Sequence, residues 1–427
     1  MLKIQKLLKM FEEIRSKPVI FVIGCTGTGK SDLGIEICKK YNGEVISVDS
    51  MQFYKGMDIA TNKVTLEEAD GVQHHMMSFL EPSTAQKYNV HDFRKQVLSI
   101  IEGLHTKQKI PVIVGGTTYY AESILYQDNF IETSNNSHDD VSSSGDEKED
   151  IHDLQALSNQ ELWDLLNLND PESARLVHPN NRERVRRAVE IHRLTGKRKS
   201  ELIKEQKKND QDLTAKLRFE NSLVLYLDAT PDVLNERLDG RVDKMVKLGL
   251  KRELVDFYEQ HKEVCSSSPY GVMQCIGLKE FIPWLELGQE ERENTVGEKV
   301  FRQCGEDVKL HTRQYAKRQR RWFHSRLLRR RSSQQTASIR TIDTSDKKTI
   351  ISSGMSVVDK WMRGEDFSET VNDDENAETG EEANRLFKCE ICEMTVSGRR
   401  NWEKHVAGKK HKHSLKTSKS EEKFNSS

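Results

Sequence analysis

The sequence predicts an α/β fold, with a parallel sheet interrupted by a helical insertion and followed by a small C-terminal zinc finger. Three observations predict this. Apolar runs rich in Val and Ile alternate with segments of helical spacing, as in parallel sheets covered on both faces. The strand pattern disappears between Gln127 and Arg218, where segments with helical spacing take its place. Near the end, two Cys and two His residues have the spacing of a zinc site.

Four strands are predicted, and each is followed by a segment of helical spacing or by a loop. They occupy Pro18–Gly24, Gly43–Ser50, Lys109–Tyr120 and Asn221–Thr230. In open parallel sheets, ligands bind beyond the carboxyl ends of the strands. The residues at those ends are Asp49, Gly115, Gly116 and Asp228. We therefore expect the functional site at this edge of the sheet.

A glycine-rich loop follows the first strand. Gly24, Gly29, Lys30 and Ser31 fit the pattern G-x-x-x-x-G-K-[ST], and a helical segment comes next, which predicts a P-loop NTPase-like core. The backbone N–H groups of such a loop and the following helix dipole bind phosphates, and a Ser at this position can ligate Mg²⁺. The pattern does not say whether the phosphates belong to ATP or to another diphosphate. The predicted diphosphate-binding residues are Gly24, Cys25, Thr26, Gly27, Thr28, Gly29, Lys30 and Ser31, with the hydroxyls of both threonines within reach of a phosphate.

Asp49 directly follows the second strand, beside the predicted phosphate site. Because two neighbouring anions repel, this carboxylate calls for a metal ion or a proton-transfer role. It is a metal ligand, a general base that faces a second substrate, or simply the N-cap of a helix. From the residues alone these three interpretations stay open.

Charge and cysteine content limit the class of protein. The net charge is -1, yet basic residues gather around Arg182–Lys199, in Lys309–Arg331 and after Lys404, and these separate blocks indicate an anionic polymer as partner. For any single block, a solvated helix face is an equally good interpretation. Seven cysteines without a framework pattern indicate a reducing compartment. No apolar run approaches the roughly 18 residues of a membrane helix. We expect a cytoplasmic monomer, with the mitochondrion (from the amphipathic N-terminus) and the nucleus (from the basic Arg329–Arg331) as further compartments.

The expected domain organisation follows from these signals. The P-loop core takes residues 18–127 and 220–331, and a helical insertion takes 128–219. In that insertion Arg182 and Arg186 share one helix face, whereas Val185 and Val189 turn inward. A basic helix after Lys309 carries aromatic residues among its arginines, and we expect its aromatics in the core and its arginines on RNA. The remaining segments are an N-terminal extension (1–17), a disordered acidic linker (332–384), the finger (385–415) and a polar tail (416–427).

The C-terminal module has the pattern C-x₂-C-x₁₂-H-x₅-H. Cys389, Cys392, His405 and His411 supply two thiolates and two imidazoles, which can surround one structural Zn²⁺ ion. His413 is an alternative to His411. Phe387 and Trp402 can form the small core of such a module. Its spacing is typical of fingers that bind structured RNA, and this module is expected to contribute tRNA affinity outside the catalytic core.

Eight blocks, in order along the chain, resemble the tRNA dimethylallyltransferases (tRNA isopentenyltransferases) of the eukaryotic type with a zinc finger. They are GCTGTGKSDL, GEVISVDSMQFYKGMDIATNK, GVQHHM, KIPVIVGGTTYY, HPNNRERVRRAVEI, RLDGRVDKMVKLGL, GVMQCIGLKEF and TRQYAKRQRRWF. The resemblance covers Pro18 to Phe323 and the finger. It departs from the family at Cys25 and Cys275 and in the acidic segment Asp139–Asp150, which looks like an added loop.

The resemblance implies an answer to which phosphates the loop holds. In this family they are those of dimethylallyl diphosphate, whose dimethylallyl group is transferred to N6 of the adenosine 3′-adjacent to the anticodon of tRNA. The resemblance implies that Asp49 is the general base, and that Thr26 and Arg241 hold the diphosphate together with Lys30, Ser31 and Mg²⁺. It also implies a set of tRNA-binding residues, namely Gln52, Thr117, Arg182, Arg186, Arg313 and Lys317.

The chemistry agrees with these roles. When the bond between the allylic carbon and the diphosphate breaks, the diphosphate departs as an anion, which cationic groups and Mg²⁺ stabilise. A carboxylate assists the weakly nucleophilic amine by taking its proton. The target base must also leave the stack of the anticodon loop to be reached. The main rival is a P-loop kinase or ATPase with Asp228 on Mg²⁺. A second rival is a non-catalytic RNA-binding protein with a degenerate P-loop, against which an intact Lys30, Ser31, Asp49 and Arg241 argue.

Overall fold

The structure is a computed structural model that describes most of the chain, in two compact units. The described residues are 17–83, 88–127, 154, 156–209, 217–267, 271–324, 338–365, 385–392, 394–408, 411–412 and 415. Those up to 127 and from 217 to 365 form unit 1, and those of 154–209 and 385–415 form unit 2. The amphipathic N-terminus (1–16), the acidic segment Asp139–Asp150, Arg329–Arg331 and the polar tail after 415 lie outside the described residues.

Unit 1 is built on a six-stranded sheet in which every pairing is parallel. The strand order is β3-β2-β4-β1-β5-β6. The strands are β1 (Val19–Gly24), β2 (Gly43–Ser47), β3 (His74–His75), β4 (Ile110–Gly115), β5 (Ser222–Asp228) and β6 (Ser338–Asp343). All four strands expected from the sequence are present, so the prediction of a parallel α/β core is confirmed.

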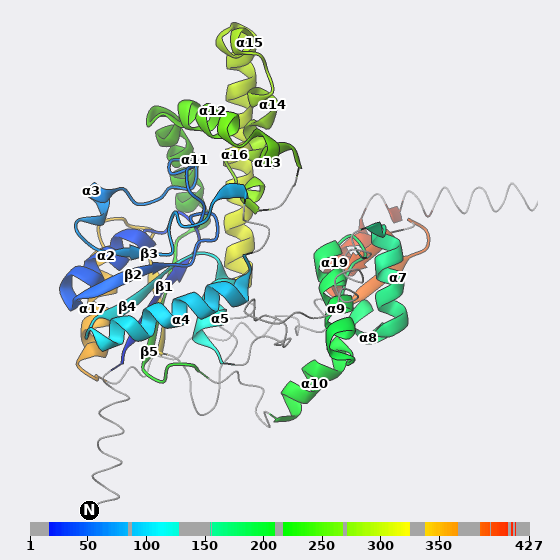
Figure 1. The fold of residues 1–427 in the computed structure, drawn as a ribbon, viewed down its shortest axis with the longest axis horizontal. Coiled ribbons are helices and arrows are strands. Elements are labelled where there is room, and N and C mark those ends of the chain that lie inside the picture. Colours follow the sequence, from blue (N-terminus) through cyan, green and yellow to red (C-terminus); the bar gives the residue numbers. More distant parts are fainter. Residues whose placement is uncertain are drawn as a thin grey trace, which may run out of the picture. The chain divides into compact units, whose positions relative to one another are not determined.

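Helices cover both faces of this sheet, because each central strand is apolar on both sides. In β1, Phe21 packs on the side of α4 (Val90–Thr106) and α5 (Thr118–Leu125). Its neighbours Ile20 and Val22 pack on the opposite side, with α2 (Lys30–Tyr41) and α17 (Ile350–Met362). Figure 1 shows α4 and α5 on one side of the strands and α2 and α17 near their other side. All of β1 is buried, as expected for a central strand.

Most of the remaining helices of unit 1 share a second apolar cluster, with the buried Phe281 and Trp284 among its members. They are α11 (Pro231–Lys247), α12 (Leu250–Gln260), α13 (Lys262–Ser267), η2 (Gly271–Gln274), η3 (Lys279–Phe281), α14 (Ile282–Leu285) and α16 (Thr295–Trp322). Two short helices, α3 (Leu66–Ala69) and α15 (Gln289–Glu293), lie outside this cluster. Among the described residues, no helix is both long and apolar enough to cross a bilayer.

Unit 2 contains the helical insertion and the finger. The insertion comprises α7 (Asn159–Asn169), α8 (Pro171–Ala174), α9 (Arg182–Thr195) and α10 (Lys199–Asn209). Val185 and Val189 of α9 are fully buried, which confirms their expected inward orientation. The finger comprises the antiparallel strands β7 (Leu386–Cys389) and β8 (Met394–Ser397) followed by α19 (Arg399–Ala407).

The prediction that residues 332–384 form a disordered linker is wrong for residues 338–362. Ser338–Asp343 form the edge strand β6, which pairs in parallel with β5, and Ile350–Met362 form α17. The strand escapes sequence analysis because an edge strand needs few apolar residues, and in β6 only Ile342 is buried. In α17, Ile350, Gly354 and Val358 are buried at a spacing of four, a helical period that the sequence does contain. The core therefore extends beyond the predicted boundary at residue 331.

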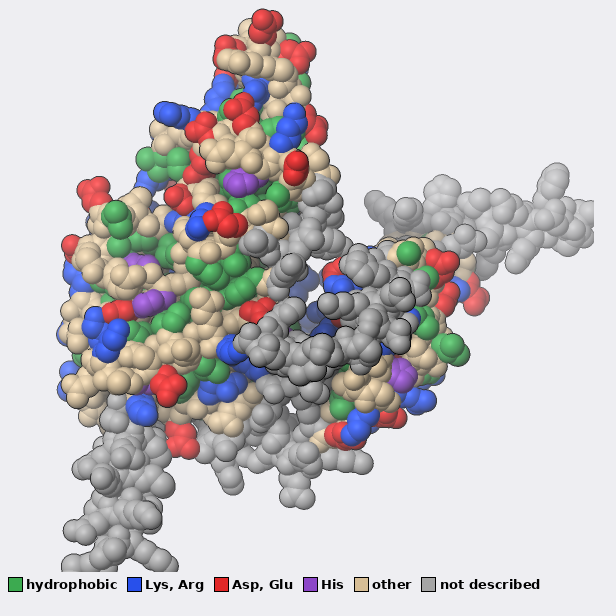
Figure 2. Space-filling model, viewed as in Figure 1, with side chains coloured by type: hydrophobic (Ala, Val, Ile, Leu, Met, Phe, Trp, Pro, Cys, Tyr) green, Lys and Arg blue, Asp and Glu red, His purple; other side chains and the backbone are tan. Residues whose placement is uncertain are grey.

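Charged side chains are spread over the visible surface of unit 1. On the face drawn in Figure 2, acidic and basic side chains alternate with apolar ones, without one continuous basic patch. Unit 1 has exposed ion pairs such as Lys55–Glu81 and Lys251–Glu298. Exposed pairs of this kind contribute little to stability.

Candidate active site

The phosphate loop lies between β1 and α2, at the carboxyl end of the sheet. Gly24 approaches the neighbouring strand so closely that a Cβ there would lie 2.2 Å from the carbonyl oxygen of Leu227. Gly29, at φ 81°, is the N-cap of α2 and directs the positive end of the helix at the loop. Glycine at these two positions thus produces the cradle that the pattern G-x-x-x-x-G-K-[ST] predicts.

A cavity of about 790 Å³ opens at this loop, and the three predicted catalytic residues line it together with part of the phosphate loop. Thr26, Lys30, Ser31, Asp49 and Arg241 all contribute to its walls, together with Gln52. The residues come from the loop, from the end of β2 and from α11. The structure therefore brings together, in one cavity, residues that are up to 215 positions apart in the sequence, as in the bond between Arg241 and Thr26.

Arg241 and Lys30 both bind to the phosphate loop. The Nη1 of Arg241 donates to the hydroxyl of Thr26 at 2.7 Å, and the Nζ of Lys30 donates to the carbonyl oxygen of Cys25 at 2.6 Å. Burial, with the neighbouring Arg241, lowers the pKa of Lys30 to about 8. An anion bound in the cavity would favour the charged ammonium and raise this pKa again.

Asp49 faces these two cations across the cavity. Its Oδ1 accepts a hydrogen bond from the backbone N–H of Met51 at 3.1 Å, so the carboxylate is held by the turn after β2. Burial raises its pKa, and this effect outweighs the opposing influence of Lys30 and Arg241. A buried carboxylate with a raised pKa is a suitable general base. The bond to Met51 also fits the capping interpretation, and the two roles are compatible.

Two side chains of the loop point into the protein instead of the cavity. Thr28 is fully buried, and its hydroxyl donates to the carbonyl oxygen of Cys25 at 2.9 Å. The thiol of Cys25 is also fully buried, donates to the carbonyl oxygen of Ala316 at 3.4 Å, and has a pKa raised to about 11 by burial. The expected phosphate contact from the Thr28 hydroxyl is therefore wrong, because that hydroxyl is used inside the loop.

Asp228 does not take part in the cavity, which bears on the kinase alternative. Its Oδ2 lies 2.9 Å from the Nη2 of Arg320, and its Oδ1 accepts from the backbone N–H of Ala229. Among the described residues, those that line the cavity do not include Asp228. The carboxylate that a Walker B strand would place on Mg²⁺ is thus committed to an arginine elsewhere.

The residues predicted to bind tRNA fall into both units. In unit 1, Gln52 lines the cavity and is held by the Ser47 hydroxyl at 2.9 Å, whereas the hydroxyl of Thr117 accepts from Ser50 at 3.5 Å. On α16, Arg313 pairs with Asp239, and Lys317 is exposed. The expected core position of the aromatic residues is confirmed for Phe323, which is fully buried.

In unit 2, Arg182 and Arg186 are engaged inside the insertion. The guanidinium of Arg182 donates to the carbonyl oxygens of Leu157 at 2.7 Å and Leu154 at 3.2 Å. Arg186 pairs with Glu183 and Glu190, each at 2.6 Å. These contacts give both arginines a role in holding the insertion together. Their predicted tRNA contact stays a prediction.

Gln319 is a site residue that sequence analysis missed. It is buried on α16, where its Nε2 donates to the carbonyl oxygen of Gly116 at 2.9 Å and its Oε1 accepts from the backbone N–H of Thr26 at 3.0 Å. A Cβ at Gly116 would lie 2.3 Å from that Nε2, so the glycine makes room for the contact. The sequence does contain a signal for this role. Gln319 is an uncharged polar residue four positions after Tyr315, on the apolar face of a basic helix.

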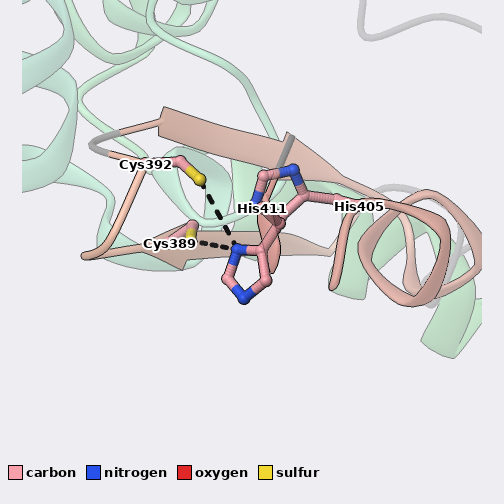
Figure 3. A group of neighbouring side chains, drawn as sticks. All are labelled: Cys389, Cys392, His405 and His411. Carbon is pink, nitrogen blue, oxygen red and sulfur yellow. Dashed lines mark hydrogen bonds between the residues drawn. The ribbon is translucent and has the colours of Figure 1, made fainter. Parts of the chain in front are cut away.

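The finger brings its four predicted ligands together (Figure 3). The ligand atoms of Cys389, Cys392, His405 and His411 all lie within 4.8 Å of one another, and Figure 3 shows their side chains converging. The Nδ1 of His411 is 3.4 Å from the sulfur of Cys389, and the Nε2 of His405 is buried without a hydrogen-bond partner among the described residues. A buried imidazole nitrogen without a partner and two thiols fit a zinc ion, which would crosslink the module. The rings of Phe387 and Trp402 stack at 5.4 Å.

The fold and the cavity define a P-loop-like protein with a partly buried carboxylate, of raised pKa, beside the phosphate loop. The IPP transferase family model matches residues 52–326, and a model of a zinc finger that binds double-stranded RNA matches residues 386–412. The chain belongs to the IPP transferase family.

Similar proteins agree with this membership. A protein of Schizosaccharomyces pombe named tRNA dimethylallyltransferase is 34% identical over 434 residues, which cover 94% of this chain and 96% of the relative. A Mus musculus protein of the same name is 33% identical over 94% of this chain and 86% of its own length. A solved structure of a eukaryotic dimethylallyltransferase acting on tRNA is similar with a TM-score of 0.78 and 31% identity, over 96% of this chain and 99% of that one. The predicted resemblance is confirmed.

Proposed function

We propose that this protein is a tRNA dimethylallyltransferase, which moves a dimethylallyl group from dimethylallyl diphosphate to N6 of the adenosine 3′-adjacent to the anticodon of tRNA. The observation that carries the proposal is the shared cavity. A carboxylate with a raised pKa, Asp49, lies in the same cavity as the phosphate loop, Lys30 and Arg241. That arrangement suits a reaction in which an anion departs and an amine loses a proton.

The residues divide between the two halves of this reaction. The loop amides, Lys30 and Arg241 bind the diphosphate and stabilise the negative charge that develops on it as the C–O bond to the allylic carbon breaks. Thr26 is held in place by Arg241 and lines the same wall. Asp49 accepts the N6 proton as the new C–N bond forms, so that the diphosphate leaves as an anion and the amine ends uncharged.

Mg²⁺ and tRNA complete the proposed complex. Ser31 lines the cavity in the first turn of α2, and its hydroxyl oxygen suits Mg²⁺, which would neutralise charge on the diphosphate when bound. Gln52, on the wall near Asp49, contacts the target adenine. The basic residues of α16, Arg313 and Lys317, and those of the insertion contact the tRNA backbone. We further propose that the protein acts as a monomer in the cytoplasm, with mitochondrial and nuclear pools as additional compartments.

The test uses an anticodon stem-loop RNA with an adenosine directly after the anticodon. The RNA is incubated with the full chain, Mg²⁺ and dimethylallyl diphosphate, and separately with ATP, and is then weighed by mass spectrometry. We expect a mass gain of one dimethylallyl group, and none when that adenosine is replaced by uridine. ATP consumption without a mass gain would favour a kinase or ATPase, against which the pairing of Asp228 with Arg320 argues.

A further inference from the structure

The loop between β6 and α17 is fixed against the phosphate cavity. Thr344 is fully buried, and both its backbone N–H and its hydroxyl donate to the carbonyl oxygen of Asp228, at 2.7 Å and 2.9 Å. The next residue, Ser345, accepts from the backbone N–H of Thr230 at 3.0 Å through its hydroxyl. Its carbonyl oxygen accepts from the Nη2 of Arg237 at 2.9 Å. The loop is thus held by the end of β5 and by α11.

The other end of the loop is anchored on the phosphate loop itself. Ile350, the first residue of α17, lies so close to Gly29 that a Cβ there would be 3.2 Å from its Cδ1. One turn further, a Cβ at Gly354 would lie 2.6 Å from the side chain of Leu33 on α2. The chain between Thr344 and Ile350 therefore runs beside the cavity with little freedom at either end, and its residues Ser345 and Lys347 line the cavity.

Lys347 is the cation that this loop adds to the cavity. Its side chain is exposed and forms no ion pair within 4.0 Å with another of the described residues. The carboxylate that it influences is Asp32, whose pKa is raised mainly by burial and by Glu68, and which Lys347 pulls back toward the charged form. Lys347 is thus near the first turn of α2 without being committed to a partner.

The charge balance of the cavity shows what Lys347 contributes. The cavity is lined by five cations (Lys30, Arg237, Arg241, Lys244 and Lys347) and four carboxylates (Asp32, Asp49, Glu68 and Glu236). Five cations against four carboxylates leave a surplus of one positive charge, which the loss of Lys347 would remove. The Nη1 of Arg237, on the side of this loop, is also buried without a hydrogen-bond partner among the described residues. Unused donors beside a phosphate loop indicate a larger anion than Lys30 and Arg241 alone would hold.

We propose that Lys347 is a donor-binding residue, whose ammonium contacts the outer phosphate of the prenyl diphosphate, and that the loop 344–349 forms a wall of the donor site. The inference rests on the proposed function, since it assigns a further residue to the same diphosphate. On this proposal, β6 and α17 hold the loop that brings Lys347 to the cavity, in addition to the cations of the phosphate loop and α11. Lys347 contacts the leaving group and takes no proton from the amine.

The chain offers a matched control at the next position. Lys348 is also exposed and carries the same charge, but it does not line the cavity. We would measure the binding of inorganic diphosphate, with Mg²⁺, to the full chain by isothermal titration calorimetry, and the KM for dimethylallyl diphosphate in the transfer assay. Lys347→Ala is expected to raise the Kd for inorganic diphosphate and the KM for dimethylallyl diphosphate roughly tenfold each, as for the loss of one charge-assisted contact. Lys348→Ala should change neither, and Lys347→Arg should retain most of the affinity.

Affinity for tRNA distinguishes this role from a general effect of charge on RNA binding. Filter binding of the anticodon stem-loop should give the same Kd for the wild type, Lys347→Ala and Lys348→Ala. Equal diphosphate affinity in the two alanine variants, with a wild type that binds diphosphate, would overturn the inference and leave the proposed function intact. A wild type that binds no diphosphate would contradict the proposed function itself, and the inference with it.

Discussion

Gln319 joins α16 to the phosphate loop, and its replacement gives a sharp test of how the site is held. Its amide makes two hydrogen bonds, to the carbonyl oxygen of Gly116 at 2.9 Å and from the backbone N–H of Thr26 at 3.0 Å. Gln319→Ala removes both partners at once. Gly116 is buried and Thr26 is half-buried, so the carbonyl oxygen loses its donor in a dry environment, whereas the N–H retains some access to water.

The magnitude follows from these surroundings. A buried polar group left without a partner costs about 1–3 kcal/mol, and the two groups together give about 2–4 kcal/mol, since water partly replaces one contact. Domains of this kind are stable by about 5–15 kcal/mol, so the variant should fold but with a clearly lower free energy of unfolding. Because the backbone N–H of Thr26 loses its contact with Gln319, the KM for dimethylallyl diphosphate should also rise.

Urea unfolding followed by circular dichroism measures the first effect, and steady-state kinetics the second. Gln303→Ala is the matched control, because Gln303 lies on the same helix but is exposed, with one hydrogen bond to Asp307 at 3.2 Å. It should change the free energy of unfolding by less than about 0.5 kcal/mol. If Gln319→Ala and Gln303→Ala are equally stable and have the same KM, Gln319 does not hold the loop as described.

Three further predictions concern the base, the insertion and the finger. Burial raises the pKa of Asp49, and the unprotonated carboxylate is the active form, so kcat should fall on acidification at a pH above the usual aspartate pKa of about 4. An acid limb at or below that value in the pH–rate profile would contradict its role. Arg182→Ala should lower the thermal stability of the insertion because two backbone carbonyls lose their hydrogen-bond donor. Arg184 is exposed, so Arg184→Ala should leave the thermal stability unchanged. Equal melting temperatures of the two variants would refute the structural role of Arg182. Cys389→Ser or zinc chelation should weaken tRNA binding while kcat at saturating tRNA persists, and a large loss of kcat would show that the finger acts in the chemical step.

The core of the fold could be predicted because its strands are buried on both faces. Continuous apolar runs such as that of β1 are typical of a parallel sheet covered on both faces, and the glycine pattern after β1 then places the phosphate loop. The edge strand β6 has no such run, since one side of it is half exposed. Its pairing with β5 depends on a partner more than 100 residues earlier, which local patterns do not contain.

The site shows the same division. Lys30 and Ser31 are adjacent within a motif, and Asp49 directly follows a predicted strand, so their positions follow from local sequence. Gln319 contacts the phosphate loop only because α16 packs against that loop, and Lys347 lines the cavity only because of where the loop after β6 lies. No local pattern distinguishes Lys347 from Lys348, although only the former lines the cavity.

The most direct measurement separates diphosphate binding from transfer in a single variant. Asp49→Asn keeps the size of the side chain but removes the base, while Lys30 and Arg241 remain in the cavity. Diphosphate affinity by calorimetry and single-turnover transfer to the anticodon stem-loop would be measured on the same preparation. We expect an affinity equal to or higher than that of the wild type and a transfer rate lowered by roughly a hundredfold or more. Transfer at the wild-type rate would show that Asp49 is not the base and that the proposed chemistry of this cavity is wrong.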